Sequence, residues 1–134
     1  GIEISIPSYA CNGNFSCTFS AGKVSEYSCN GYSACYKNSG DISAFSCFGA
    51  SSCFGNMGDI SEFSCIADYA CSSNKGDVPK NSCNGRFSCG YNTGKVSEYS
   101  CSGDKACISN SGDISTFSCV GNHACNANEG NVDA

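Results

Sequence analysis

The sequence is poor in basic residues and contains a single His and no Trp. Seven Lys and Arg against twelve Asp and Glu give a net charge of −5. Nucleic acids and anionic membranes bind clustered Lys and Arg, so this balance argues against both as partners. No apolar run is long enough to span a bilayer. Zinc-type C-x2-C spacing is absent, and His123 has no nucleophile motif beside it. These absences predict a protein that is not an enzyme and needs no cofactor and no metal.

Cysteine is the residue that the sequence has in excess. The 14 Cys make up more than a tenth of the chain, a usage typical of disulfide scaffolds. Disulfides persist in oxidising compartments, so the composition predicts a secreted, extracellular protein. The chain begins at Gly1 and shows no signal peptide, so we interpret it as a mature or processed form whose leader is missing.

An 18-residue repeat fills nearly the whole chain without insertion or deletion. One coil reads VSEYSCNGYSACYKNSGD and the next reads ISAFSCFGASSCFGNMGD. The period is too short for a βαβ unit and lacks helical apolar spacing, so it predicts an all-β fold, a single-domain parallel β-helix or β-solenoid. Seven coils about 4.8 Å apart give a rod roughly 34 Å long, whose handedness is left open. Residues 1–5 are a strand outside the repeat, residues 6–131 are the seven coils (6–23, 24–41, 42–59, 60–77, 78–95, 96–113 and 114–131), and residues 132–134 begin an incomplete eighth coil.

Residues at the same position of successive coils form columns of one chemical type. Position 1 is always β-branched, which suits a buried, pleated column. Position 4 is aromatic in six coils, and position 15 is Asn in six, so stacked Asn side chains are expected to hydrogen-bond from coil to coil. Position 17 is always Gly, which predicts a turn with positive φ. The columns are Ile6, Val24, Ile42, Ile60, Val78, Val96 and Ile114 (position 1); Tyr9, Tyr27, Phe45, Phe63, Tyr99 and Phe117 (position 4); Asn38, Asn56, Asn74, Asn92, Asn110 and Asn128 (position 15); and Gly22, Gly40, Gly58, Gly76, Gly94, Gly112 and Gly130 (position 17).

Each coil carries one C-x5-C pair, and two pairing schemes are possible. Bridges between coils would join Cys of one column, whose spacing of about 4.8 Å falls within disulfide range. Each column holds seven Cys, however, and an odd number leaves one unpaired. We therefore expect one disulfide within each coil, which contributes roughly 2.4 kcal/mol by closing a seven-residue loop. The expected pairs are Cys11–Cys17, Cys29–Cys35, Cys47–Cys53, Cys65–Cys71, Cys83–Cys89, Cys101–Cys107 and Cys119–Cys125.

The segments SCNGYSAC, SCSGDKAC and SCVGNHAC resemble the SCxGxxAC unit of a cysteine-rich repeat family of secreted algal and bacterial proteins. The resemblance covers residues 6–131 and implies location and fold rather than an activity. The general plan is also similar to that of insect antifreeze proteins, which are disulfide-stapled solenoids with a regular Thr array as their ice-binding face. This sequence departs from that pattern, because Thr18, Thr93 and Thr116 lie in three different columns.

One acidic column is a candidate metal site. Asp41, Asp59 and Asp77 occupy position 18 of three successive coils, so their carboxylates are expected to stack about 4.8 Å apart. Such a stack repels itself unless a cation such as Ca²⁺ or the amides of the turn hold it. Calcium-binding solenoids carry more Gly and Asp than this one, which favours hydrogen bonds from each carboxylate to its own Gly turn.

A second acidic column consists of Glu26, Glu62 and Glu98 at position 3. Carboxylates two coils apart have the separation of an inverting glycosidase pair. The constant coil length leaves no loop for a cleft, and Lys80 interrupts the column, so a solvated surface is expected instead.

Further aromatic residues lie at variable positions, and some must face outward on so thin a rod. Outward rings would contact neighbouring molecules or stack on sugars. These residues are Phe15, Tyr32, Tyr36, Phe48, Phe54, Tyr69, Phe87 and Tyr91.

The regular coils and the absence of a recognisable set of catalytic residues favour a non-catalytic extracellular structural protein. Such a protein would be a rigid rod that assembles end to end into filaments or matrix. The repeat stops at residues 132–134 without a capping segment, so we expect self-association in which the strand GIEISI of one subunit completes its neighbour. The alternative is a module that binds ice or carbohydrate on one flat face.

Overall fold

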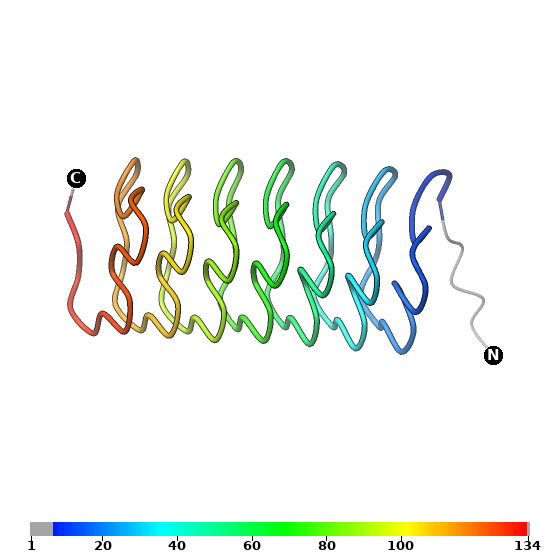
Figure 1. Ribbon diagram of the computed structural model, residues 1–134, viewed down its shortest axis with the longest axis horizontal. Helices are drawn as coiled ribbons and strands as arrows, with labels where there is room; N and C mark the ends of the chain where they lie inside the picture. Colours follow the sequence, from blue (N-terminus) through cyan, green and yellow to red (C-terminus); the bar gives the residue numbers. More distant parts are fainter. Residues whose placement is uncertain (1–6, 134) are drawn as a thin grey trace.

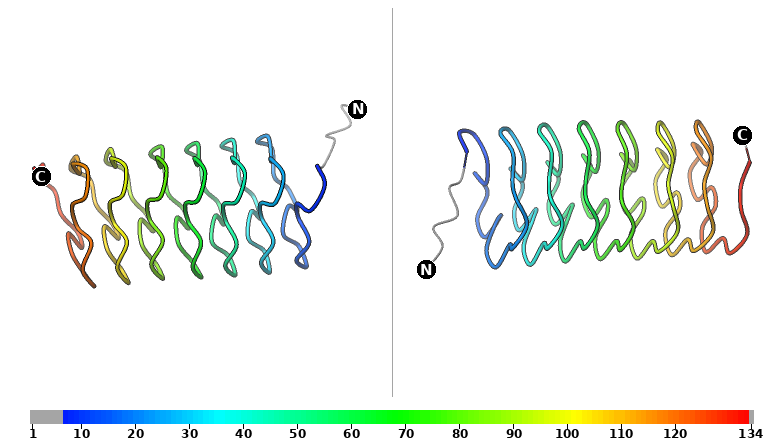
Figure 2. Two further views of the ribbon diagram at one scale, coloured as in Figure 1. Left: turned by 90° about the horizontal axis from the view of Figure 1, so that it is seen from above. Right: turned by 180° about the vertical axis from the view of Figure 1, so that it is seen from behind.

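The chain winds coil after coil along a single axis (Figure 1). The structure is a computed structural model that describes residues 7–133. Figure 2 shows the coils lying beside one another in sequence order, so that spatial neighbours are residues about 18 apart. The strand expected at residues 1–5 lies outside the described residues. Val132 pairs with Ile114 as Ile42 pairs with Val24, so residue 132 continues the position 1 column.

β-Structure is confined to one residue per coil. At each such site the next coil donates and accepts one backbone hydrogen bond: the Ile42 amide donates to the Lys23 carbonyl (2.8 Å), and the Ser25 amide donates to the Ile42 carbonyl (2.9 Å). Between residues 7 and 133 there is no longer strand and no helix, so no helix could cross a membrane. The predicted parallel β-helix therefore stays a prediction, and the observed architecture is a rod of stacked coils. The parallel bridges are Val24–Ile42, Ile42–Ile60, Ile60–Val78, Val96–Ile114 and Ile114–Val132.

Left-handed residues bend each coil at four recurrent positions. Positions 4, 6, 10 and 14 have φ close to 60° in all seven coils, as in Tyr27 (57°), Cys29 (56°) and Ser33 (51°). Residues other than Gly adopt this backbone conformation at a cost of roughly 1–2 kcal/mol each, so the conformation persists only where the surrounding structure fixes it. Here a disulfide and the hydrogen bonds to both neighbouring coils provide that constraint.

The prediction that the position 17 glycines have positive φ is wrong. Gly55, at position 14, is the one glycine with positive φ among residues 7–133. The position 17 glycines are needed because successive coils touch there: a Cβ on Gly40 or on Gly58 would lie 1.9 or 2.1 Å from the carbonyl oxygen of the next glycine in the column. Close backbone approach, rather than a left-handed turn, explains why this column admits no side chain.

The interior of the rod is narrow and is built from small side chains. Ile42, Ile60 and Val78 of position 1 are each 1% exposed, and the Cys of coils 24–41 to 96–113 are fully buried. The Ser residues of position 5 are buried beside them, and the Ser46 hydroxyl donates to the Ser61 carbonyl of the next coil (2.8 Å). Because the position 5 hydroxyls have partners, their burial carries little desolvation penalty, whereas the buried Ser52 hydroxyl of position 11 has no hydrogen-bond partner.

A ladder of Asn side chains also runs through the core, as the sequence predicted. The Asn56 Nδ2 donates to the Asn38 Oδ1 (2.9 Å) and to the Gly58 carbonyl of its own coil (2.6 Å). The same inter-coil bond recurs from Asn74 to Asn56 (2.9 Å) and onward to Asn128. Each amide thus fixes its own turn and the stacking register at once.

The contact between glycines predicts unequal effects of two Gly→Ala substitutions. Gly58→Ala should lower the denaturant midpoint by the equivalent of about 1–3 kcal/mol, because its Cβ would meet the next backbone. Gly90→Ala should change stability much less, since its nearest non-neighbour atom would lie 3.3 Å away. Guanidinium titrations of the oxidised variants, followed by circular dichroism, measure both shifts. Equal effects would contradict the proposed close approach.

Candidate functional site

A column of seven disulfides runs along the interior. Each joins position 6 to position 12 of the same coil, with Cα atoms 5.5–5.7 Å apart. No free Cys occurs among the described residues. The bonds are Cys11–Cys17, Cys29–Cys35, Cys47–Cys53, Cys65–Cys71, Cys83–Cys89, Cys101–Cys107 and Cys119–Cys125.

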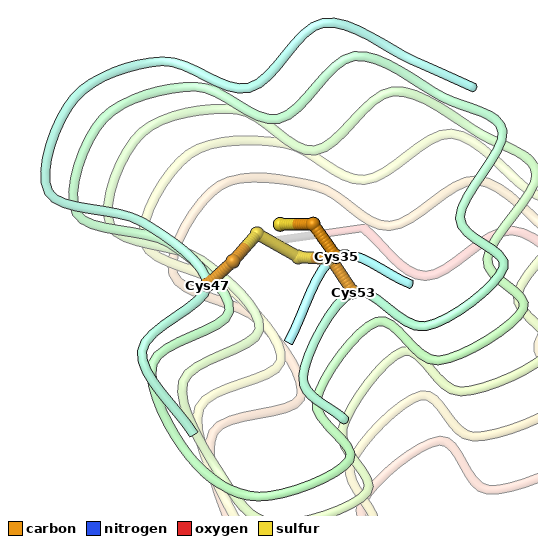
Figure 3. A group of neighbouring side chains, drawn as sticks. All are labelled: Cys35, Cys47 and Cys53. Atoms are coloured by element: carbon orange, nitrogen blue, oxygen red, sulfur yellow. A yellow bond between two sulfur atoms is a disulfide. The ribbon is translucent and has the colours of Figure 1, made fainter. Parts of the chain in front are cut away.

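Neighbouring disulfides lie close enough to resemble a metal centre. The sulfur atoms of Cys35, Cys47 and Cys53 all lie within 4.8 Å of one another (Figure 3). Cys47 and Cys53 are bonded to each other, however, and Cys35, in the preceding coil, is bonded to Cys29 of that same coil. A thiolate, and not a disulfide sulfur, is the metal ligand. In the oxidised chain these sulfur groups are therefore stacked disulfides, which fill the space that large apolar side chains occupy in other cores.

The position 18 carboxylates act as acceptors for the backbone of the preceding coil. The Asp41 Oδ1 accepts from the Lys23 amide, the Asp59 Oδ1 from the Asp41 amide, and the Asp77 Oδ1 from the Asp59 amide, each at 2.9 Å. The carboxylates do accept hydrogen bonds from backbone amides, but these amides belong to the preceding coil. The prediction that each carboxylate bonds to the Gly turn of its own coil is therefore wrong. Calcium binding by these three exposed residues stays a prediction.

An amide side chain makes the same bond where the column lacks Asp. The Asn131 Oδ1 accepts from the Asp113 amide (3.1 Å), and the Asn122 Oδ1 accepts from the Asp104 amide at position 9 (3.0 Å). Sequence analysis missed the position 9 bonds, although Asp68, Asp104 and Asn122 in one column could have revealed them. What these columns share is an acceptor oxygen and not a negative charge.

The position 3 carboxylates lie on the surface. Glu62 makes an ion pair with Lys80 of the next coil (4.0 Å), and both side chains are about half exposed. A pair so exposed contributes little to stability. His123 is exposed too, and its backbone amide donates to the Asp104 carbonyl (2.8 Å).

Aromatic rings of position 4 form a stacked ladder on the outside of the rod. We define the aromatic column as Tyr9, Tyr27, Phe45 and Phe63, whose successive ring centroids are 5.0, 5.1 and 5.4 Å apart and nearly parallel. All four rings are exposed, from 39% for Tyr27 to 64% for Tyr9. Asn81 interrupts the ladder, which resumes in the last two coils.

The aromatic residues at the variable positions face outward in part, as expected. Phe15, Tyr32, Phe54, Tyr69 and Tyr91 are exposed. The other three rings, those of Tyr36, Phe48 and Phe87, are half-buried. The outer faces of the rod are therefore rich in aromatic surface.

The geometry defines a cysteine-rich tandem-repeat protein with one disulfide in each 18-residue coil. The family model described as a domain of unknown function, DUF7640, matches residues 2–78 and again residues 63–134. The two matches together cover nearly the whole chain, and the chain belongs to this family. No curated protein and no solved structure matches it.

The hydrogen bonds of the Asp column predict how substitutions at Asp59 behave. Asp59→Ala should lower stability by about 1 kcal/mol, because the exposed Asp41 amide loses its acceptor. Asp59→Asn should be nearly neutral, since the amide oxygen can accept the same bond as Asn131 does. Thermal unfolding with and without millimolar Ca²⁺ tests both substitutions. A Ca²⁺-dependent rise in the midpoint that disappears in Asp59→Asn would show that the column binds the ion instead.

Proposed function

We propose that this protein is a non-catalytic, extracellular structural rod that self-associates. The observation that carries the proposal is the column of seven disulfides within a narrow core, of which the five from Cys29–Cys35 to Cys101–Cys107 are fully buried. Seven such loops contribute about 17 kcal/mol in the chain-entropy model, which exceeds the roughly 5–15 kcal/mol of net stability typical of a domain. A fold that depends so strongly on oxidised Cys fits an oxidising compartment, in keeping with the resemblance to secreted repeat proteins.

The stacked coils support a rigid rod. Each coil from 24–41 to 96–113 is bonded to the next through its backbone, its position 5 Ser hydroxyl and the Asn ladder, as between Ser64 and Pro79 (2.7 Å) and between Asn74 and Asn56 (2.9 Å). Bending the rod would lengthen several of these bonds together. Stiffness and resistance to unfolding are properties that suit a matrix component.

The aromatic column supports association between rods. An exposed stripe of Tyr and Phe along successive coils is a surface of the kind that marks protein contacts. Side-by-side contact through this stripe is the mode of association that the described residues favour. End-to-end assembly, which the sequence suggested, stays a prediction, and so do filaments.

The double substitution Phe45→Asn and Phe63→Asn tests association through the aromatic column. Asn81 already occupies position 4 with φ 56°, and Asn tolerates this conformation, so the variant should keep its fold. Light scattering over a concentration series, with electron microscopy, should show assemblies of the unaltered chain. The double variant should need at least about tenfold more protein to associate.

Tyr32→Asn provides the matched control. Tyr32 is 58% exposed outside the aromatic column, and position 9 carries Asn in two other coils. This variant should associate like the unaltered chain. An unaltered chain that stays monomeric at high concentration and forms no filaments would overturn the proposed structural role.

A further inference from the structure

A trough lies on a different face of the rod from the aromatic column. It has a volume of about 340 Å³, and we define it by Phe54, Tyr69, Ser72, Phe87, Gly90 and Tyr91. These residues belong to positions 10, 13 and 14 of three successive coils, so the trough runs along the rod axis. Its size is at the lower end of the range of small-molecule sites, about 300–1,000 Å³.

The trough exists because position 13 is small in two adjacent coils. Ser72 and Gly90 lie there between Phe54 of the preceding coil and Ile108 of the following one. Gly90 does not have positive φ, and a Cβ there would lie 3.3 Å from the Phe87 carbonyl and 3.6 Å from Ile108. Neither backbone conformation nor contact between coils demands a glycine here, unlike at position 17. The main effect of Gly90 is to leave the floor of the trough open.

Aromatic side chains form the sides of the trough. Tyr69 and Phe87 stack on each other with centroids 4.9 Å apart and planes within 2°. This pair ends at Tyr69, because position 10 of the preceding coil is Ser51, which also lines the trough. Tyr91 is 64% exposed and Tyr69 is 44% exposed, so both present apolar ring surface and a phenolic hydroxyl to a ligand.

The polar side-chain groups that line the trough are all uncharged hydroxyl groups. Ser51, Ser72 and Ser73 line it together with the two Tyr residues, and no Asp, Glu, Lys or Arg does. The Arg86 guanidinium lies over the Phe87 ring, 5.9 Å from its centroid, and is not part of the lining. Whereas the buried Ser46 hydroxyl is bonded to the next coil, these three Ser residues are half-buried at an open surface.

We propose that the trough binds a neutral carbohydrate chain. Pyranose rings have apolar faces, which pack on aromatic side chains, and hydroxyl groups, which exchange hydrogen bonds with Ser and Tyr. A lining without charge disfavours phosphorylated, sulfated and uronic sugars, whose charge would lose water without gaining a partner. An axial trough over successive coils accepts an extended oligosaccharide in preference to a compact ligand. Through it the structural rod would attach to a polysaccharide.

Calorimetric titration of the oxidised monomer with soluble tetrasaccharides tests the proposal. The panel consists of neutral cello-, chito-, xylo-, manno- and malto-oligosaccharides, an oligogalacturonate as the charged comparison, and a flat aromatic dye. At least one neutral member should bind, and the oligogalacturonate should not. Binding of the uronate with equal affinity, of the dye alone, or of no sugar at millimolar concentration would each overturn the proposal.

Three substitutions locate the site, and each has a precedent in its own column. Gly90→Phe fills the floor with the residue that position 13 carries at Phe54, and Tyr69→Ser replaces a side ring with the residue that position 10 carries at Ser51. Each should weaken sugar binding at least about tenfold, the loss expected when one well-packed anchor is removed. Phe15→Ser also replaces an aromatic ring by Ser in the position 10 column, but outside the trough, and should leave the affinity unchanged.

Circular dichroism and thiol counting establish that each variant is folded and fully oxidised. Retained affinity in both Gly90→Phe and Tyr69→Ser would place any sugar binding elsewhere and overturn the assignment of the trough. Because the titration uses monomer, its result is independent of whether the rods associate.

Discussion

The disulfide across each coil is the constraint on which the rest of the structure depends. An 18-residue coil encloses room for one aliphatic side chain, a few Ser and Asn groups and two Cys, which is too little apolar surface to hold the chain by itself. Four or five residues of each coil also adopt the left-handed conformation, which is unfavourable for residues other than Gly. The covalent link between positions 6 and 12 closes a seven-residue loop within each coil, and the hydrogen bonds between coils maintain the stacking.

Much of this arrangement could be predicted, because identical residues at one position of successive coils stack on one another and therefore contact their own kind. The Asn ladder followed from an Asn in every interior coil, and an odd number of Cys in each column pointed to bridges within coils. The position 17 glycines were misread because an invariant Gly has two physical causes, positive φ and close backbone approach, and the sequence alone does not separate them. The residues with positive φ, such as Tyr27 and Cys29, gave no signal, since their types do not favour that conformation. The expected strands are reduced to single bridges for the same reason, because left-handed turns interrupt the extended backbone.

The division between a constant interior and a variable exterior also explains where function can lie. Positions 1, 5, 6, 12 and 15 are nearly the same in every coil, because each must match the coil above and below. Positions 10, 13 and 14 vary. Surface features at these positions depend on which residues happen to lie side by side in adjacent coils. The trough is such a feature: it needs small Ser72 and Gly90 beside the stacked Tyr69 and Phe87, which lie in adjacent coils. The repeat pattern could not reveal the trough, since positions 10, 13 and 14 keep no common residue type from coil to coil.

The most direct test of the account is a map of the disulfides in the purified protein. The chain is unfolded in denaturant without reductant, free thiols are blocked, and trypsin cleaves after Lys and Arg. Pairing within coils predicts that peptide 24–37, which contains Cys29 and Cys35, is released alone and lighter by two hydrogen atoms than its dithiol form. It also predicts that peptide 81–86 stays joined to peptide 87–95 through Cys83 and Cys89. Peptide 24–37 joined to peptide 38–75, which would require a bridge between coils, would contradict the central role of the coil-closing disulfide.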